Sequence, residues 1–419
     1  MELKKYKIGD LAHVTRGASL GGEFYATQGN YVRLTCGNFD YRNNCFKENQ
    51  SKDNIYYTGG FKEEFLLEKG DIITPLTEQA IGLLGSTARI PESGKYIQSQ
   101  DIAKIDCNES LLDKDFAFYL ISSACVKQQL SAAAQQTKIR HTSPDKIKEC
   151  TVWIPPLDVQ KRIGRILTDI DNKIAINRQI NDNLEAMAKQ LYDYWFVQFD
   201  FPNEEGKPYK SSCGAMVWNE KLKRKIPQGW SNGVLSDVAN ITMGQSPDGS
   251  SYNEDGEGII FYQGSTDFGL RFPDIRQYTT SPSRYANKGD ILMSVRAPVG
   301  ALNIANNDCC IGRGLSALSS KIGSMTHLYY LMNDFRLKFE GMNSAGTTFG
   351  SITKDELFSL PVIIPTKSVI SEFEQVCEPI FDKQMIIGEE INALTKQRDE
   401  LLPLLMNGQA SVNYHLSDD

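Results

Sequence analysis

The sequence repeats itself once, and this internal repeat restricts the possible fold more than any other feature of the chain. A block that begins at Asp10 returns at Asp237, an offset of 227 residues. Further on, Lys69-Gly70-Asp71-Ile72 returns as Lys288-Gly289-Asp290-Ile291 at an offset of 219, and a third block near the end of each copy matches at an offset of 210. Three blocks in the same order indicate a duplication, with loops of different length between the shared elements.

The end of each copy carries a heptad pattern of apolar residues, which is typical of a helix that packs along its length on another helix. The seam covers residues 159–191, without Ile174, and residues 369–401. Each stretch predicts a helix of about 40 residues, or about 60 Å. An ordinary amphipathic helix on a globular core gives a similar pattern, but two equivalent long stretches favour mutual pairing. The residues expected in this contact are Ile163, Ile166, Ile170, Leu184, Leu191, Phe373, Val376, Ile380, Leu394 and Leu401.

The rest of each copy has short β-rich runs that are broken by Gly, Asn, Asp and Ser, and it closes with a modest helix. The chain is therefore predicted to be an α+β protein that contains two similar domains, each followed by a long helix. The predicted parts are residues 1–155 for the first domain, 156–199 for the central helix, 200–229 for a connector, 230–365 for the second domain, 366–408 for the C-terminal helix and 409–419 for a tail.

The composition is that of an ordinary folded protein, but its charge is uneven. The 419 residues are 41% hydrophobic and 23% charged, and the formal net charge is −7. Residues 1–150 hold 19 basic and 19 acidic side chains, residues 226–365 have a net charge of −3, and residues 366–419 have a net charge of −6. An acidic total argues against a nucleic-acid-binding protein. The two large blocks, however, are close to neutral.

The sequence contains no apolar run near the ~20 residues that cross a bilayer, and its first residues lack the apolar stretch of a signal peptide. Nine cysteines without a Cys-x-x-Cys motif fit reduced thiols better than a disulfide framework or a zinc site. We therefore expect a cytoplasmic protein that does not contact a membrane.

The motifs of several catalytic classes are missing from the sequence. There is no phosphate-binding Gly-x-x-x-x-Gly-Lys-Ser/Thr loop, no Asn/Asp-Pro-Pro-aromatic motif of an amino-methyltransferase, and no zinc-binding companion for any of the four histidines. A nuclease pattern assembled from Pro144-Asp145 and Asp171-Asn172-Lys173 is of a kind that often arises by chance. These absences disfavour a nuclease or a stand-alone methyltransferase. A protein–protein scaffold with duplicated interaction domains remains open, as does a module that recognises a divided DNA site.

Three motifs resemble those of a known family. The segment Leu191-Tyr192-Asp193-Tyr194-Trp195-Phe196-Val197-Gln198-Phe199 resembles the aromatic end of the central helix in specificity subunits of type I restriction–modification systems. In the same family, Ile226-Pro227-Gln228-Gly229-Trp230 resembles the start of the second target-recognition domain, and Lys288-Gly289-Asp290-Ile291-Leu292-Met293-Ser294-Val295-Arg296 resembles a motif within it. Their order, together with the repeat, extends the resemblance over essentially the whole chain.

The resemblance implies a non-catalytic subunit in which two target-recognition domains lie at opposite ends of an antiparallel helical coiled coil, with a pseudo-two-fold repeat. Each domain would read one half of a bipartite double-stranded DNA sequence, and the helices would set the spacing between the halves. Two modification subunits that carry S-adenosylmethionine would dock on this chain and methylate adenines. Restriction subunits that use ATP and magnesium would cleave unmethylated DNA. No cofactor or metal is expected on this chain itself.

Side chains that reach base edges read a DNA sequence, whereas phosphate contacts set the register. We expect the readers among arginines, lysines, amides and hydroxyls of glycine-rich loops; a surface salt bridge or a solvated loop is the competing interpretation for each. The candidates are Arg16, Ser19, Arg33, Lys138 and Arg140 in the first domain, and Gln245, Ser246, Arg271, Arg296, Arg313 and Thr348 in the second. Gly17 and Gly244 are interpreted as backbone-turn positions. Because both domains are near neutral, useful DNA affinity is predicted to require basic surface from partner subunits.

Overall fold

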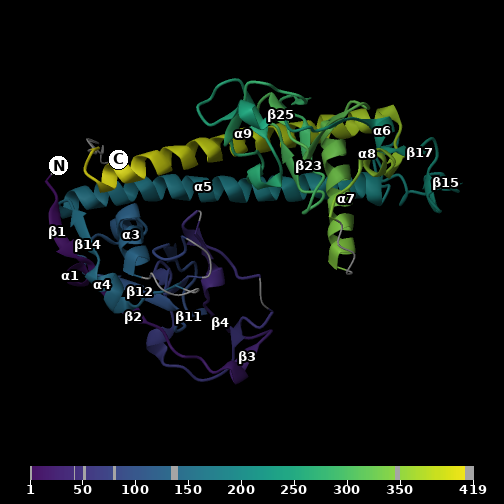
Figure 1. Ribbon diagram of the computed structural model, residues 1–419. Coiled ribbons are helices and arrows are strands. Elements are labelled where there is room, and N and C mark those ends of the chain that lie inside the picture. The colour runs from purple at the N-terminus through teal and green to yellow at the C-terminus, as the bar shows by residue number, and fades with distance from the viewer. Residues whose placement is uncertain are drawn as a thin grey trace. The chain divides into compact units, whose positions relative to one another are not determined.

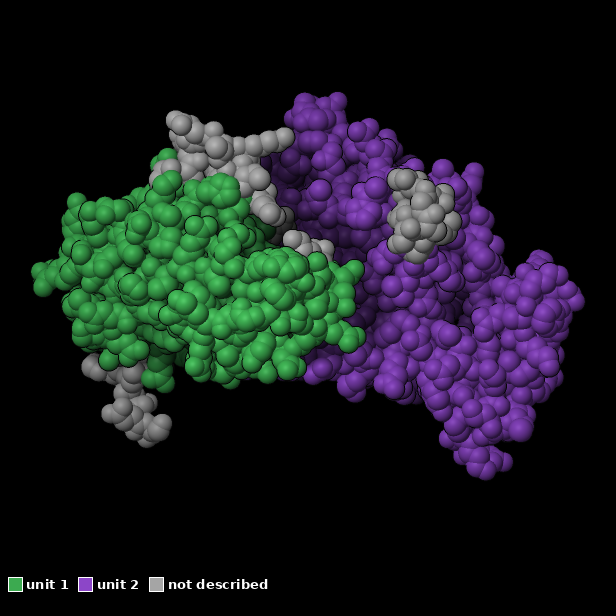
Figure 2. Space-filling model, turned by 90° about the horizontal axis from the view of Figure 1, so that it is seen from below, with its two compact units in different colours: residues 1–174, 393–419 green, residues 175–392 purple. Residues whose placement is uncertain are grey.

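The computed structural model describes residues 2–41, 43–50, 53–78, 82–133, 140–344 and 350–410 (Figure 1). The chain forms two compact units: unit 1 contains residues 1–174 and 393–419, and unit 2 contains residues 175–392 (Figure 2). Two long helices, α5 (Leu157–Tyr192) and α9 (Lys367–Met406), contribute residues to both units. The combination of helices with several small sheets confirms the predicted α+β class.

Unit 1 builds its domain on two sheets and a two-stranded ribbon. The strands are β1 Lys4–Lys7, β2 Ala12–Arg16, β3 Tyr25–Ala26, β4 Tyr31–Arg33, β7 Tyr56–Tyr57, β8 Ile72–Pro75, β10 Ala88–Arg89, β11 Tyr96–Ile97, β12 Ile102–Cys107 and β14 Thr151–Ile154. The first sheet has the antiparallel order β10-β8-β12-β2. The second has the order β11-β4-β7-β3, in which β11 and β4 are parallel. The ribbon pairs β1 with β14, so the two ends of the domain lie side by side.

Unit 2 repeats the two sheets and the two-stranded ribbon of unit 1. Its strands are β17 Ser231–Val234, β18 Ala239–Met243, β19 Tyr252–Asn253, β20 Ile259–Tyr262, β21 Gln277–Thr279, β22 Tyr285–Ala286, β23 Ile291–Ser294, β24 Leu302–Ile304, β25 Cys309–Ile311, β26 Leu315–Ser320 and β27 Pro361–Ile364. The first sheet has the order β24-β23-β26-β18, and β17 pairs with β27. The second sheet, β22-β25-β20-β21-β19, adds only β22 to the order found in unit 1. The common topology confirms the internal repeat.

Helices cover the sheets of both units. In unit 1 they are α1 Ile8–Leu11, α2 Lys114–Ile121, α3 Ala124–Ala133 and α4 Pro144–Glu149, and in unit 2 they are α6 Leu235–Val238, α7 Met325–Ser344 and α8 Lys354–Phe358. Side-chain caps start several of them: Asp113 accepts a hydrogen bond from the Phe116 N–H at 2.9 Å, and Thr353 and Glu356 form a capping box. None of the described helices combines the length and the apolar composition that a bilayer-spanning helix requires.

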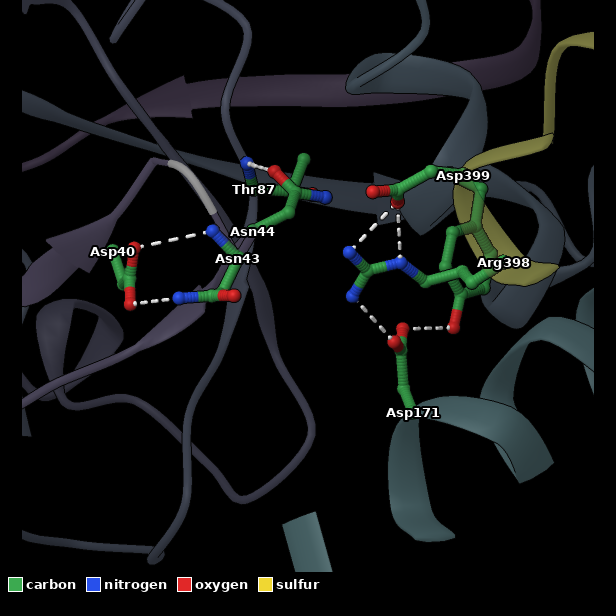
Figure 3. Close-up of polar contacts among 8 residues, drawn as sticks. Asp40, Asn43, Asn44, Thr87, Asp171, Arg398 and Asp399 are labelled. Atoms are coloured by element: carbon green, nitrogen blue, oxygen red, sulfur yellow. Dashed lines mark hydrogen bonds and ion pairs between the residues drawn. The ribbon is translucent and has the colours of Figure 1, made fainter. Parts of the chain in front are cut away.

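Three further strand pairs lie outside these sheets. They are β5 (Phe39–Asp40) with β6 (Cys45–Phe46), β9 (Thr77–Glu78) with β13 (Arg140–His141), and β15 (Met216–Asn219) with β16 (Arg224–Pro227). Polar side chains hold the turn between β5 and β6. Asp40 accepts from the Asn43 side chain at 2.7 Å, and Asn44 donates to Thr87 Oγ1 at 2.8 Å (Figure 3).

The two long helices pair through a heptad seam, but this seam differs from the predicted one at every second position. The buried positions that follow this heptad are 160, 163, 167, 174, 177, 181 and 188 in α5, and 370, 373, 377, 384, 387, 391 and 398 in α9; positions 164 and 192 in α5 and 369, 381, 388, 405 and 406 in α9 are buried as well. Of the predicted contact residues, Ile163 and Phe373 are fully buried. The half-buried members of the predicted set are Ile166, Ile170, Leu184, Leu191, Ile380, Leu394 and Leu401.

The prediction was wrong for Val376, which is 48% exposed, whereas its neighbour Cys377 is fully buried. It was also wrong to leave Ile174 out of the seam, because this side chain is only 3% exposed. The physical reason is that several true contact positions carry polar residues, among them Asn181 and Gln384. A search for apolar periodicity passes over such positions and selects the neighbouring apolar residues instead.

Polar contacts fix the direction of the pairing. In unit 2, Asn177 Nδ2 donates to Glu390 Oε2 at 2.9 Å, and Asn181 Nδ2 donates to the Gln384 carbonyl at 3.4 Å. Residue numbers therefore rise along α5 while they fall along α9, as they do in an antiparallel pair. The contact between Asp171 and Arg398 in unit 1 follows the same order (Figure 3).

Candidate nucleic-acid interface

In both units, a glycine loop that follows one strand lies on the loop that follows another. In unit 1, Gly17 follows β2, and a Cβ at this position would come within 2.2 Å of the Gln98 carbonyl oxygen. In unit 2, Gly244 follows β18, and a Cβ there would come within 2.2 Å of the Gly312 carbonyl oxygen. Neither glycine has a positive φ, so close backbone approach, rather than the turn that we predicted, requires glycine at these positions.

We call the set of loops around Gly17 the loop edge of unit 1. Here the Ala18 N–H donates to the Gln98 carbonyl at 2.9 Å, and Arg16 Nε donates to the Gln100 carbonyl at 2.7 Å. The Arg16 and Ser19 side chains are exposed at this edge. The short β9–β13 pair, which follows β8, places the backbone of Arg140 opposite Glu78. The Arg140 side chain and Lys138 lie outside the described residues.

The loop edge of unit 2 gathers four of the predicted readers. The Arg313 N–H donates to Ser246 Oγ at 3.3 Å, and the Gln245 N–H donates to the Ile311 carbonyl at 3.0 Å. The Val295 N–H donates to the Gly314 carbonyl at 2.9 Å. Because Arg296 follows Val295 and Arg313 precedes Gly314, this hydrogen bond brings the backbones of the two arginines close together. The side chains of Gln245, Arg296 and Arg313 are exposed, and Ser246 is half-buried. Thr348 lies outside the described residues.

Two predicted readers are engaged within their own units. Arg33 is only 7% exposed, lies 3.8 Å from the centre of the Tyr25 ring, and donates from Nη2 to the Asn54 carbonyl at 3.2 Å. The Arg271 side chain is 9% exposed and lies against the long helices, where it contacts Glu185 at 3.5 Å. The structure thus places Arg271 in an internal polar cluster and not on the loop edge.

The sequence interpretation missed Arg284 and Ser283 of unit 2. The Arg284 carbonyl accepts from the Ile311 N–H at 2.9 Å, and Ser283 Oγ donates to the Gln245 carbonyl at 2.5 Å, so both residues belong to the same loop edge. The Arg284 side chain is exposed. No repeat partner or glycine-rich context marks these two residues in the sequence, and only the folded chain brings them beside Gln245.

The electrostatics of both edges favour an anionic ligand. Within the part of the chain that the structure describes, Arg16, Arg284, Arg296 and Arg313 form no ion pair with a carboxylate. Unpaired guanidinium groups in fixed loops can bind phosphate oxygens or the O6 and N7 atoms of guanine, and an exposed amide such as Gln245 can bind adenine. The described residues contain no group of three or more His, Cys, Asp or Glu side chains that could hold a metal ion.

Comparisons with known proteins found relatives that cover most of the chain. Residues 1–186 and 227–400 match the family model described as the type I restriction modification DNA specificity domain. The chain is 33% identical over 349 residues, 80% of its length, to a Methanocaldococcus jannaschii protein assigned as the specificity subunit of the type I restriction enzyme MjaX, of which 77% is covered.

A second relative and a solved structure cover nearly the whole chain. The HindI type I restriction enzyme specificity subunit of Haemophilus influenzae is 22% identical over 97% of this chain and 99% of its own length. The crystal structure of the type I restriction-modification S subunit from M. genitalium has a TM-score of 0.61 at 16% identity, and the alignment covers 97% of this chain and 96% of that one. The latter likeness shows the same fold.

Proposed function

Because this chain belongs to the family of type I restriction–modification DNA specificity subunits, we propose that it reads a bipartite double-stranded DNA sequence, one half with each unit. The observation that carries this proposal is the repeated sheet order, which in each unit brings a loop edge to the ends of equivalent strands; Arg16 is exposed at this edge in unit 1, and Arg284, Arg296 and Arg313 are exposed in unit 2. Two similar but separately variable edges suit a site with two different halves.

The loops are suited to sequence reading because their backbone is fixed. Close approach at Gly17 and Gly244 holds each loop against its neighbour, so the side chains that follow start from defined positions. A bidentate contact from an arginine to guanine contributes about 1–3 kcal/mol of discrimination against the wrong base. We assign this role to Arg16 in unit 1 and to Arg313 in unit 2, and we assign a contact with adenine to Gln245 in unit 2.

The same proposal assigns catalysis to partner subunits. Two modification subunits with S-adenosylmethionine would methylate adenines, and restriction subunits with ATP and magnesium would cleave unmethylated DNA, while this chain supplies recognition. The near-neutral charge of the two domains supports this division of roles between the subunits. Affinity for DNA depends on basic side chains that neutralise phosphates, and the chain as a whole has a net charge of −7. We therefore expect tight binding only in the assembled complex.

The test is a comparison of methylated adenines after expression of the complex with altered specificity chains. Arg313→Ala is expected to relax the base requirement in one half of the site, and Arg16→Ala in the other half. Arg165→Ala is the matched control because its side chain is 63% exposed on α5 and belongs to neither loop edge. An unchanged methylation motif in both loop variants would contradict the assigned readers. A complex without any sequence preference would instead support a scaffold that does not recognise DNA.

A further inference from the structure

Each unit has a surface pocket, and the two pockets occupy repeat-equivalent places. The pocket of unit 1 has a volume of about 350 Å³, and that of unit 2 has a volume of about 380 Å³. In unit 1, the residues that define it are Leu3, Leu120, Val152, Trp153, Leu402 and Met406. Their counterparts at offsets of 227, 211 and 210 residues are Trp230, Leu331, Val362, Ile363, Tyr192 and Phe196, and all six line the pocket of unit 2.

The equivalence follows from the fold. In each unit, the pocket lies where the end of one long helix meets a helix of the domain and the edge of the two-stranded ribbon. In unit 1 these elements are α9, α2 and β14, and in unit 2 they are the turn that ends α5, α7 and β27. No residue of either loop edge lines these pockets. DNA reading therefore leaves both pockets unexplained.

The lining of each pocket is mainly apolar, and cations lie beside it. In unit 1, Lys5 Nζ lies 5.9 Å from the centre of the Trp153 ring. In unit 2, Arg224 and Lys338 line the pocket themselves, and the one carboxylate among the lining residues, Asp334, pairs with Lys189 at 3.3 Å. Among the described residues, none of the three cations Lys5, Arg224 and Lys338 forms an ion pair. An occupant that buries an apolar side chain and places a carboxylate beside it would complement both pockets in shape and in charge.

The pocket of unit 2 also contains a buried polar atom without a partner. His327 is 2% exposed, and its Nδ1 accepts or donates no hydrogen bond among the described residues. The counterpart of His327 in unit 1 is Phe116, which has no such atom. Burial lowers the pKa of His327 to about 3, so the ring is neutral and one of its nitrogens is an acceptor. A tyrosine or tryptophan side chain in this pocket could donate to it.

We infer that the two pockets are docking sites for two copies of one partner, the modification subunit, each of which inserts an apolar side chain next to a carboxylate. This inference rests on the proposed function for the identity of the partner. A pocket that is present twice in one chain fits an occupant that is present twice in the complex. The unpaired cations beside both pockets give the charge complementarity that selects an acidic segment of that occupant.

The first experiment counts modification subunits on the full chain by native mass spectrometry after co-expression. Val197→Glu places a negative charge on the rim of the unit 2 pocket, where it repels the carboxylate of the occupant, and Trp153→Glu does the same in unit 1; these side chains are 45% and 52% exposed. We expect two copies on the wild-type chain, one on each single variant and none on the double variant. The controls are Val217→Glu and Trp218→Glu, since these residues are 45% and 54% exposed and line neither pocket.

The outcomes separate this inference from the proposed function. A wild-type chain that binds no modification subunit overturns the proposed function. A wild-type complex with two copies that survives the double substitution overturns the docking inference alone. Circular dichroism of each variant shows whether a lost copy reflects unfolding. Controls that lose a copy as readily as the pocket variants also count against the inference.

A second experiment needs no substitution. Cys125 is exposed and lines the unit 1 pocket, whereas Cys213 is exposed and lines neither pocket. Bound modification subunit is expected to slow alkylation of Cys125 at least tenfold and to leave Cys213 reactive. Equal alkylation of Cys125 in the free chain and in the complex would place the partner elsewhere.

Discussion

The two units share a fold, yet they connect their domains to the long helices through different polar groups. In unit 1, Tyr119 of α2 donates to Asp171 of α5 at 2.6 Å, and Asp171 accepts from Arg398 of α9 at 3.0 Å. In unit 2, Tyr330 of α7 is the counterpart of Tyr119 and donates to Glu185 of α5 at 3.2 Å. Burial, reinforced by the adjacent carboxylate, raises the pKa of both tyrosines, so their hydroxyls remain donors.

Only the tyrosine is common to the two clusters. The repeat-related positions of Asp171, Glu185 and Arg398 are occupied by Phe381, Thr395 and Ala188, which cannot make the same contacts. In unit 2 the guanidinium comes from the domain itself, through Arg271. The two copies therefore share the apolar pattern and the strand order, whereas each copy forms its polar contacts with different residues.

This difference has a physical consequence for the pairing of the helices. Each buried polar side chain in the seam has a partner in one register only, so a shift of α5 along α9 would leave carboxylates and amides buried without partners. The apolar residues alone tolerate several registers. We infer that the polar residues select one register and that the two units select it with different residues.

The largest expected effect on stability tests the apolar packing of the helices in the two units. Phe373 is fully buried in unit 2, and its ring lies 4.8 Å from that of Phe196 and 5.5 Å from that of Trp195. Phe373→Ala is expected to lower the free energy of unfolding by about 3–5 kcal/mol because it leaves a large cavity. The counterpart in unit 1 is Ile163, and Ile163→Val should cost only about 0.5–1.5 kcal/mol. Urea denaturation measures both, and equal losses would show that the two contacts are not packed as described.

The next largest expected effect on stability tests the polar contacts between the helices. Arg398 has a side chain that is 9% exposed and pairs with Asp171, which is 28% exposed. Arg398→Ala is expected to cost about 2–3 kcal/mol, less than the ~3–5 kcal/mol of a fully buried pair because Asp171 still reaches water. The double variant with Asp171→Asn should recover part of this loss, since the only carboxylate that then lacks the Arg398 cation is Asp399, which is 59% exposed. Arg165→Ala, at a 63% exposed position, should stay within about 0.5 kcal/mol.

The sequence predicted those features of the fold that depend on periodicity and order. The repeat, the α+β class and the long paired helices follow from positions such as Ile163 and Phe373, where an apolar residue is also the buried residue. The seam was misplaced where the buried residue is polar, as at Asn181 and Gln384. At these positions hydrogen bonds, and not hydrophobic contacts, compensate for the burial of polar side chains. Such positions can be recognised only when the hydrogen-bond partner is known.

The candidate interface shows the same limit. Gln245 and Arg313 were found because they stand in glycine-rich loops, and the fold brings these loops together. Arg271 also stands near a glycine, but its guanidinium lies between the Tyr329 and Phe381 rings, at 5.5 and 4.9 Å from their centres. Local sequence does not distinguish an arginine that faces solvent from one that joins a domain to a helix.

A change of pH should reveal a difference in stability between the two units at another repeat-related pair of residues, His327 and Phe116. Burial lowers the pKa of His327 to about 3, whereas an unfolded histidine has a pKa of about 6.5. Below pH 6.5 the unfolded chain binds a proton that the folded chain does not, so stability falls as the pH falls from 6.5 toward 3. At pH 5 this loss is about 2 kcal/mol relative to pH 7.

His327→Phe introduces the residue that unit 1 has at the equivalent position, Phe116, and should remove this contribution. Urea denaturation at pH 7 and pH 5 measures the difference between the wild type and the variant. A wild-type chain whose stability has the same pH dependence as that of the variant would show that His327 is already protonated in the fold.

The smallest expected effect decides between the predicted and the observed helix seam. Val376 belongs to the predicted seam but is 48% exposed, whereas Cys377 belongs to the observed seam and is fully buried. Val376→Ser should change the free energy of unfolding by no more than about 0.5 kcal/mol, as surface substitutions usually do. Cys377→Ser buries a hydroxyl in place of a thiol and should cost about 1–3 kcal/mol. Because both variants introduce the same residue at adjacent positions of one helix, helix propensity contributes little to the difference. If Val376→Ser cost more than Cys377→Ser, the pairing face of α9 would be turned by one residue, and the polar contacts of Gln384 and Arg398 could not form in the same register.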